Sequence, residues 1–455
     1  MLANTLRNQT VGGQETLFGF VGLIFVVVGL VHLYLWQRLV RDPLRPGRSR
    51  RLGGLVAVLL AALVPATLIG TRSGRVEWLA WPGYLWLALM FYLLVTLIVL
   101  EIPRLAATLW LRRNPRPESK DTRPESKATR PRSKDAQPSS NSTSPSSNDT
   151  PPSSEDSRPS NKGTRQASEV KETPPEAAAQ QDRVDRRLLL ARGAAIFAGL
   201  TAAGVTGYGV KTALGPPRLD RVQIPLAKLP RSLDGTRFAV VSDIHLGPLT
   251  GSHHLSRIVD MINSTNADVV CVVGDLVDGM VDELGRFAEP LADIKSQQGA
   301  YFVTGNHEYY SGFRPWIDEV SRLGLRPLRN ERLELGALDL AGVNDLGGEQ
   351  FGDGPDLAKA LGDRDSNRPV ILLAHQPVVA KQAAQYGVDL QLSGHTHGGQ
   401  LVPFNLIVRL EQPVVSGYGK VDGVPVYVTN GAGFWGPPVR VGAPPQVTLV
   451  ELRTP

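Results

Sequence analysis

Four long apolar segments mark the N-terminal half of the chain. Three of them follow one another closely, and they cover Leu17–Leu35, Leu52–Ile69 and Trp78–Leu100. Each is close to the roughly 20 residues that a helix needs to cross a bilayer. The alternative, that these runs are core helices of a soluble domain, is weak for three runs of this length in succession. The fourth segment, Leu188–Val210, is rich in alanine and glycine. The pattern predicts an all-α transmembrane region of about four helices, with three of them in residues 1–113.

A polar segment separates the third apolar run from the fourth. Residues 114–185 are rich in serine, proline, asparagine and charged residues, and Arg-Pro-Glu-Ser-Lys occurs both at Arg116–Lys120 and at Arg123–Lys127. Such a composition cannot bury enough apolar surface to offset the entropy lost on folding. We therefore expect residues 114–185 to be a disordered linker.

Short apolar runs alternate with helical patterns after the fourth segment, over residues 219–455. The β-rich runs are Phe238–Val241, Val269–Val273, Tyr301–Val303, Val370–Leu373 and Val388–Leu392. Helical periodicity follows at Leu255–Ile262, Glu283–Lys295, Trp316–Leu323, Leu357–Leu361 and Val378–Tyr386. Strands that alternate with helices indicate an α/β domain. Residues 332–343 read as a hairpin that turns at Gly336.

The distribution of basic residues predicts the orientation in the membrane. The net charge is +6, and six arginines lie between Arg38 and Arg51, directly after the first apolar run. The positive-inside rule places this connection in the cytoplasm. The linker is then also cytoplasmic, and the domain after about Lys211 is on the extracytoplasmic face of a multi-pass cell-membrane protein. Because the basic residues flank apolar segments and fill the linker, we expect no nucleic-acid partner.

Two arginines precede the fourth apolar segment, which we delimit as residues 186–211. Arg186 and Arg187 are ordinary cytoplasmic flanking charges in the simpler interpretation. The alternative is a twin-arginine export signal, which a receptor reads as an address. Both interpretations carry the following domain across the membrane.

Metal-ligand residue types follow each of the five β-rich runs. They are Asp243 and His245, then Asp275, then Asn306 with His307, then His375, and finally His395 and His397. Ligands of α/β sheets bind at the carboxyl ends of the strands, and residues two apart in an extended segment face the same side. One such motif alone is commonplace. Five in succession, all at predicted strand ends, indicate a two-metal centre.

These motifs resemble those of the calcineurin-like metallophosphoesterases. The blocks are D-x-H at Asp243–His245, G-D-x-x-D at Gly274–Asp278, G-N-H-E at Gly305–Glu308, the single His375, and G-H-x-H at Gly394–His397. The extended form G-H-T-H-G-G-Q is similar to the membrane-linked branch of the family. That branch often has Ser-Arg-Gly where this chain has Thr429-Asn430-Gly431. The resemblance implies a four-layer α-β-β-α sandwich built on two mixed sheets.

The resemblance also implies how two divalent metal ions are held. One ion would be bound by Asp243, His245, Asp275 and His397, and the other by Asp275, Asn306, His375 and His395. Mixed nitrogen and oxygen ligands suit Mn, Fe and Zn alike. A metal-bridging hydroxide would attack phosphorus, and His307 would stabilise the transition state or act as the general acid. For Asp278 and Glu308, a direct role and a role in orienting a ligand both stay open.

The combined features predict a membrane-anchored phosphoesterase that acts on a phosphomonoester, phosphodiester or pyrophosphate. The anchor favours a lipid-linked or cell-envelope phosphoester, and the resemblance adds UDP-diacylglucosamine-type pyrophosphates as candidates. An external catalytic domain conflicts with a cytosolic nucleotide-linked substrate. The alternative function is a catalytically inactive binding or sensory module of the same fold. A transporter is disfavoured because the apolar segments lack the intramembrane charges that mark transport pathways.

Overall fold

The computed structural model describes residues 22, 25–72, 76–113 and 175–455 of the chain. By its internal contacts the chain divides into two units, one formed by residues 1–102 with 187–455 and the other by residues 103–186. Of the predicted linker, residues 114–174 lie outside the described residues, whereas residues 175–185 are helical and form the start of α4. The expectation of disorder therefore stays a prediction for residues 114–174.

Three of the described helices are long and apolar enough to cross a membrane. They are α2 (Arg48–Arg72), α3 (Ala80–Arg113) and α4 (Pro175–Leu214), and their candidate spans are Arg48–Thr71, Glu77–Ala106 and Arg187–Leu214. These spans coincide with the second, third and fourth predicted segments. Residues 25–36 of the first segment are helical and lead into the π-helix η1 (Gln37–Arg41), and the 3-10 turn η2 (Glu77–Leu79) precedes α3. The remainder of the first predicted segment lies outside the described residues.

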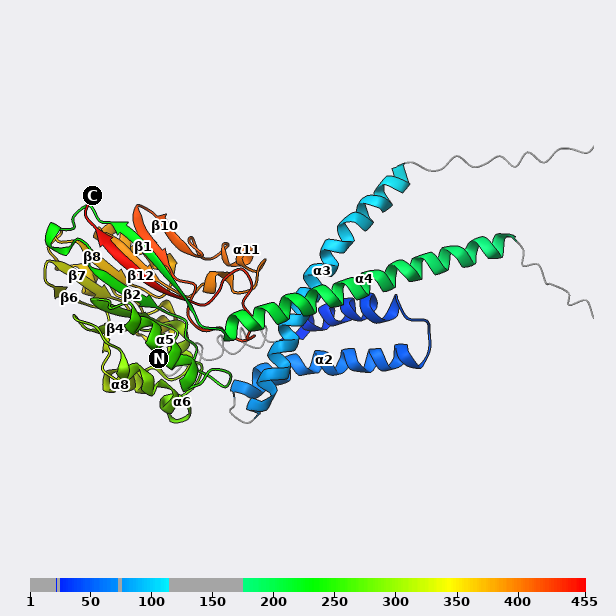
Figure 1. Cartoon of the computed structure of the whole chain (residues 1–455), viewed down its shortest axis with the longest axis horizontal. Helices are drawn as coiled ribbons and strands as arrows, with labels where there is room; N and C mark the ends of the chain where they lie inside the picture. Colours follow the sequence, from blue (N-terminus) through cyan, green and yellow to red (C-terminus); the bar gives the residue numbers. More distant parts are fainter. Residues whose placement is uncertain (1–21, 23–24, 73–75, 114–174) are drawn as a thin grey trace, which may run out of the picture. The chain divides into compact units, whose positions relative to one another are not determined.

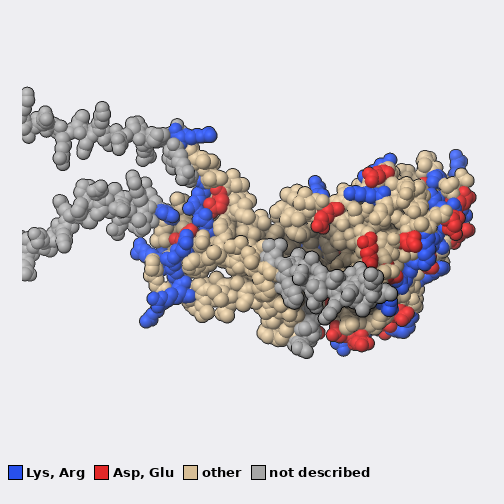
Figure 2. Space-filling view, turned by 180° about the vertical axis from the view of Figure 1, so that it is seen from behind, with Lys and Arg blue, Asp and Glu red and all other residues tan. Residues whose placement is uncertain are grey.

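Charge is distributed unevenly over the helical part. On the face shown in Figure 2, basic side chains gather at one end of these helices and the middle is almost free of charge. Among these basic residues, Arg38 forms ion pairs with Asp42 at 3.1 Å and with Glu101 at 2.5 Å. An apolar middle with a basic end is the arrangement expected of helices in a bilayer. The orientation of the chain in the membrane stays a prediction.

Two six-stranded mixed sheets follow α4 (Figure 1). The first has the order β1 (Arg218–Pro225), β12 (Gln446–Arg453), β2 (Arg237–Val241), β3 (Val269–Val273), β4 (Ala300–Val303) and β5 (Arg326–Pro327). The second has the order β10 (Gly417–Val421), β11 (Val424–Val428), β9 (Leu390–Ser393), β8 (Val370–Leu373), β7 (Leu338–Gly342) and β6 (Glu331–Leu335). The pairs β12–β2, β10–β11 and β6–β7 are antiparallel, and the other pairs are parallel.

The two sheets pack face to face, and β3 shows how its sequence allows this. Successive side chains of a strand point to opposite faces. Cys271 lies in the core between the sheets, whereas Val270 and Val272 lie in the core between the first sheet and its helices. All five residues of β3 are buried. A strand that is apolar at every position is therefore covered on both faces.

Helices cover the outer face of each sheet. The first sheet packs against α5 (Ser252–Ser264), α6 (Val281–Ala288) and α8 (Phe313–Arg322), and the second against α9 (Leu357–Leu361) and α10 (Ala380–Ala383). Figure 1 shows α5, α6 and α8 together beside the first sheet. The shorter elements are η3 (Arg231–Leu233), η4 (Glu289–Asp293), α7 (Asn306–Tyr310), η5 (Leu346–Phe351), η6 (Pro377–Val379), η7 (Ala384–Tyr386), η8 (His397–Gly399) and α11 (Asn405–Val408). The predicted α/β fold with layers α-β-β-α is confirmed.

All five β-rich runs identified in the sequence are strands, namely β2, β3, β4, β8 and β9. In the first sheet, β2, β3 and β4 run parallel, and in the second β8 and β9 run parallel. Their carboxyl ends therefore lie at one edge of each sheet. The predicted hairpin is the antiparallel pair β6–β7.

Candidate metal centre

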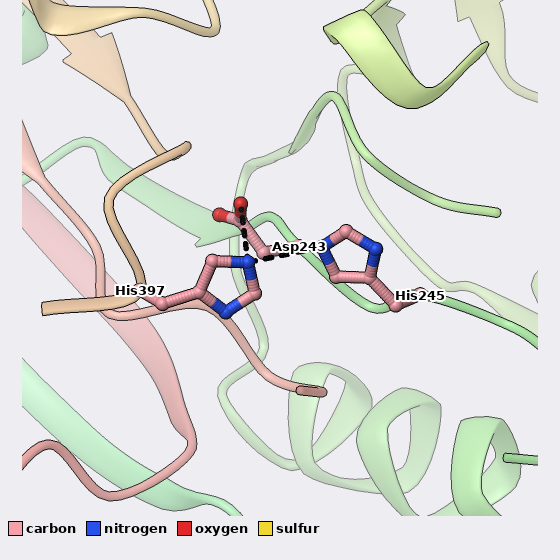
Figure 3. A group of neighbouring side chains, drawn as sticks. All are labelled: Asp243, His245 and His397. Atoms are coloured by element: carbon pink, nitrogen blue, oxygen red, sulfur yellow. Dashed lines mark hydrogen bonds and ion pairs between the residues drawn. The ribbon is translucent and has the colours of Figure 1, made fainter. Parts of the chain in front are cut away.

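The loops after the five parallel strands bring the predicted metal ligands into two neighbouring groups. Donor atoms of Asp243, His245 and His397 all lie within 4.8 Å of one another, and so do those of Asp275, His375 and His395. Figure 3 shows the first group, in which the carboxylate and the two imidazoles point toward one another. In this group Nε2 of His397 lies 3.0 Å from Nε2 of His245 and 3.3 Å from Oδ1 of Asp243.

Asp275 lies between the two groups. Its Oδ2 is 3.1 Å from Nε2 of His375 and 3.9 Å from Nε2 of His245. The seventh predicted ligand, Asn306, places Oδ1 3.0 Å from Nδ1 of His395. All seven positions thus meet in one place, and a single carboxylate is shared between the two groups.

The donor set fits a cation at His375. Nδ1 of His375 donates a hydrogen bond to the carbonyl oxygen of Val273 at 2.8 Å, so in the neutral ring Nε2 carries the lone pair. That nitrogen is buried, has no hydrogen-bond partner among the described residues, and faces Oδ2 of Asp275. Two electron-rich atoms at such a distance require a positive charge between them, which a proton or a divalent cation supplies.

Five of the seven predicted ligands adopt backbone conformations that side-chain-bearing residues rarely adopt. Their φ angles are 50° for Asp243, 49° for His245, 53° for Asp275, 72° for His395 and 51° for His397. Positive φ at a non-glycine residue costs about 1–3 kcal/mol, and such residues cluster at functional sites. The surrounding fold therefore holds these loops in strained conformations that direct the ligands to the centre.

Two glycines of the motifs are needed because the loops approach one another closely. A Cβ on Gly394 would lie 2.4 Å from Oδ2 of Asp243. A Cβ on Gly274, whose φ is +77°, would lie 2.6 Å from Nδ1 of His375. Any larger residue at either position would displace a predicted ligand.

Asp278 and Glu308 orient other groups of the centre. Asp278 accepts a hydrogen bond from Nδ1 of His245 at 2.8 Å, which directs Nε2 of that ring toward the other ligands. Glu308 is fully buried and accepts hydrogen bonds from the backbone N–H groups of Gly305, Asp275 and Leu276 at 2.6, 3.0 and 2.7 Å. Of the two interpretations that the sequence left open, these contacts favour support of the ligands.

His307 stands beside the two groups, and neighbouring carboxylates raise its pKa. Burial disfavours the imidazolium, but the carboxylates of Asp275 and Asp278 outweigh that effect and raise the pKa of His307 to about 9. Nδ1 of His307 lies 2.6 Å from Oδ1 of Asp278. The side chain is still 13% exposed, so substrate can reach it. These are the properties of a proton donor.

Arg440 is part of the centre, although its sequence position did not suggest this. It is fully buried and donates hydrogen bonds to the carbonyl oxygens of Gly433 at 2.6 Å and Ala443 at 3.0 Å. It also donates to Nδ1 of His397 at 3.1 Å. Because a guanidinium only donates, Nδ1 of His397 is the acceptor in this contact, and the neutral ring carries its proton on Nε2. The one feature of the sequence that could have pointed to Arg440 is that it is a charged residue within the otherwise apolar stretch 437–441.

The fold and the centre together define the metallophosphoesterase class of protein. The sequence model described as Calcineurin-like phosphoesterase matches residues 236–399. The chain belongs to this family, which confirms the resemblance drawn from the motifs.

Curated relatives share the domain. A "Transmembrane protein with metallophosphoesterase domain" from Danio rerio is 40% identical over 272 residues, which are 57% of this chain and 62% of that protein. An "Uncharacterized metallophosphoesterase" from Helicobacter pylori is 38% identical over 256 residues, 56% of this chain and 68% of that protein. One from Aquifex aeolicus is 35% identical over 243 residues, 52% of this chain and 92% of that protein. The chain spans less than two thirds of the zebrafish relative. The apolar helices and the name of that relative agree in indicating membrane association.

Proposed function

We propose that the chain is a membrane-anchored metallophosphoesterase that hydrolyses a phosphoester with two divalent cations. The observation that carries this proposal is the position of Asp275, whose Oδ2 lies 3.1 Å from His375 and 3.9 Å from His245. One carboxylate is thereby available to both ligand groups. Two cations held by these groups would neutralise the charge of the phosphoester and supply an activated water.

Each of the two groups of donor atoms would hold one cation. One cation would be held by Asp243, His245, Asp275 and His397, and the other by Asp275, Asn306, His375 and His395. The first group offers imidazole nitrogens and carboxylate oxygens. The second adds the amide oxygen of Asn306, 3.0 Å from His395. This mixture suits Mn, Fe and Zn.

His307 completes the reaction as the proton donor. Its Nδ1 is occupied by Asp278 at 2.6 Å, so Nε2 is the nitrogen that is free to protonate the leaving alkoxide. The carboxylates that raise the pKa of His307 favour the protonated ring that this role requires. A leaving alkoxide that gains this proton departs as a neutral alcohol, which lowers the barrier to cleavage.

The substrate class follows from the membrane anchor. The span in α4 ends at Leu214 and β1 begins at Arg218, a connection that can reach at most about 14 Å. The domain of residues 219–455 is thereby kept at the membrane surface. A phosphomonoester, phosphodiester or pyrophosphate linked to a lipid or to the cell envelope is therefore favoured. The topology that goes with this proposal is multi-pass, with residues 114–185 in the cytoplasm and the catalytic domain outside.

The test uses the full chain, purified in detergent and freed of metal with a chelator. Mn, Fe or Zn is added back, and hydrolysis of a bis-aryl phosphate and of an aryl phosphomonoester is measured. Metal-dependent turnover supports the proposal. A folded protein that binds metal but hydrolyses neither probe, nor any phospholipid or lipid pyrophosphate, would support the inactive binding or sensory module instead.

A further inference from the structure

An apolar surface segment follows directly after the metal-binding motif. Residues 401–408 read Leu-Val-Pro-Phe-Asn-Leu-Ile-Val and contain no charge. Large apolar side chains are exposed along residues 402–410, which we call the apolar loop: Val402 at 40%, Phe404 at 41%, Leu406 at 60%, Ile407 at 55% and Leu410 at 83%. Soluble domains rarely expose apolar side chains that lie side by side unless these form an interaction site.

The apolar loop is packed against the loop that carries His397. Gly399 lies two residues after His397, and a Cβ there would be only 2.4 Å from the Cα and Cβ atoms of Asn405. Leu401, directly before the loop, forms β-bridges with Val441 and Gly442. The position of the apolar loop is therefore fixed relative to the metal centre.

Trp435 joins the apolar loop to the mouth of the metal centre. Its backbone N–H donates to Oε1 of Gln400 at 3.0 Å, and Nε2 of Gln400 donates to the carbonyl oxygen of Trp435 at 3.0 Å. The ring of Trp435 is 6.0 Å from that of His307, and Trp435 is 52% exposed. Tyr310, which is 61% exposed, also lies 5.5 Å from the His307 ring. Exposed Trp and Tyr side chains are typical of positions at a membrane–water interface.

Two hydrogen bonds connect the last membrane helix to the apolar loop. Gly209, near the end of the α4 span, accepts a hydrogen bond from the N–H of Arg440 at 2.9 Å. The next residue, Val441, donates to the carbonyl oxygen of Gln400 at 2.8 Å, directly before the loop. All of these residues belong to the same unit of the chain. The loop therefore lies close to the end of a helix that is apolar enough to span the bilayer.

We propose that the apolar loop, together with Trp435, docks into the bilayer that the chain's own helices span. The occupant is the lipid because the short connection after Leu214 and the contact at Gly209 keep this apolar phase within reach of the loop at all times. Arg409 is the only charged residue of the loop. Such a surface is suited to the boundary between headgroups and acyl chains.

Docking has a consequence for the substrate, which rests on the proposed function. With the apolar loop in the lipid and Trp435 at the interface, the mouth of the metal centre opens at the level of the headgroups. An amphiphilic phosphoester would reach His307 while its acyl chains stay in the bilayer. The docking itself does not depend on hydrolysis and is tested separately.

The chain allows a selective label at the proposed contact. Its single cysteine, Cys271, is fully buried, so a thiol introduced at the surface is the one that reacts. Leu406→Cys and Leu410→Cys are labelled with an environment-sensitive fluorophore in the full chain, reconstituted at one copy per lipid nanodisc. The matched control is Glu334→Cys on β6, which is 64% exposed and on the strand farthest from β10 in the second sheet.

We expect both loop labels to emit at shorter wavelength than the Glu334→Cys control and to be quenched several-fold more strongly by lipids with brominated acyl chains. Emission and quenching equal to the control at both positions, in variants that keep the wild-type melting temperature, overturn the proposal. A blue-shifted emission without quenching by brominated lipids also overturns it, because the loop is then covered by protein. Energy transfer between labels in discs that hold two copies would identify a second chain as that cover.

A kinetic test addresses the consequence for the substrate. Leu406→Glu is expected to lower several-fold the rate on an amphiphilic phosphodiester in nanodiscs, relative to the rate on a water-soluble bis-aryl phosphate. If the wild-type loop docks but Leu406→Glu leaves the ratio of these two rates unchanged, the substrate is not delivered to the centre from the bilayer. Absence of hydrolysis of every probe would contradict the proposed function, whereas the fluorescence result would still decide whether the loop docks.

Discussion

Oδ1 of Asp278 lies 2.6 Å from Nδ1 of His307, and the same carboxylate binds Nδ1 of His245 at 2.8 Å. One side chain therefore orients a predicted metal ligand and the predicted proton donor together. In the proposed ligand sets His307 holds no cation, so its role can be separated from metal binding. This separation leads to the first prediction.

His307→Gln is expected to lower kcat by about 10²–10⁴-fold, the usual contribution of a general acid, and to leave the bound metal unchanged. Steady-state kinetics on a bis-aryl phosphate and elemental analysis of the same preparation check both parts. The loss should be smaller for a probe whose leaving phenol is already acidic. Loss of metal together with activity would instead place His307 among the ligands.

The pH dependence of kcat should show an alkaline limb. The neighbouring carboxylates raise the pKa of His307 to about 9, so the donor is protonated below that pH and loses its proton as the pH rises. Bound cations repel this proton, and the midpoint is therefore expected at or below about pH 9. A pH profile of kcat measures the limb, and the His307→Gln variant should lack it. An identical limb in the variant would show that another group titrates.

Asp278→Asn should affect two observables at once. Loss of the carboxylate beside His307 removes a group that raises its pKa, so the alkaline limb should move to lower pH. Replacing the carboxylate that accepts from Nδ1 of His245 by a neutral amide should weaken metal binding by about 10–100-fold. Metal titration and the pH profile measure the two effects. A purely structural role would lower the melting temperature and leave the limb where it is.

Arg440→Met should destabilise the catalytic domain. It leaves the carbonyl oxygens of Gly433 and Ala443 without the donor they have now, at about 1–3 kcal/mol for each buried group. The melting temperature should fall because these buried carbonyl oxygens lose their hydrogen bonds. Arg440→Lys is the control, since a single ammonium replaces only part of these bonds, and it should be intermediate. A wild-type melting temperature in Arg440→Met would contradict this role.

The elements of the catalytic domain could be predicted because local signals agreed with the fold. Val269–Val273 is β-rich and apolar at every position, and β3 has the same bounds in the structure. The predicted ligands were found for a related reason, since each follows such a run where the strand ends. Position in sequence was enough there because parallel strands place their ends at one edge.

Other features depend on contacts between distant parts of the chain and could not be predicted. Arg440 contacts His397 across 43 positions, and no local periodicity marks such a pair. Residues 401–408 are an apolar run that is as compatible with a core strand as with a surface segment, because composition alone does not separate the two. Their exposure became visible only in the folded domain. The positive φ angles of Asp243 and His245 were likewise not apparent from their residue types.

Asp275→Asn addresses the carboxylate that the two ligand groups share. An amide offers one oxygen and no negative charge, so it cannot balance two cations as a carboxylate does. We expect loss of hydrolysis and of at least one bound ion. The fold should change little, because the Oδ1 atom of the new side chain can still accept the hydrogen bond that the backbone N–H of His307 donates to Asp275 at 2.9 Å. Circular dichroism and elemental analysis check these outcomes. Full activity in this variant would contradict a bridging role.

The number of metal ions in the purified full chain tests the central claim most directly. Elemental analysis by mass spectrometry, on protein reconstituted with Mn, Fe or Zn and freed of excess metal, should give two ions per chain. The same preparation should lose hydrolysis as the ions are removed and regain it as they return. A folded chain that binds no divalent metal ion under these conditions, or that hydrolyses phosphoesters equally well without one, would contradict the account.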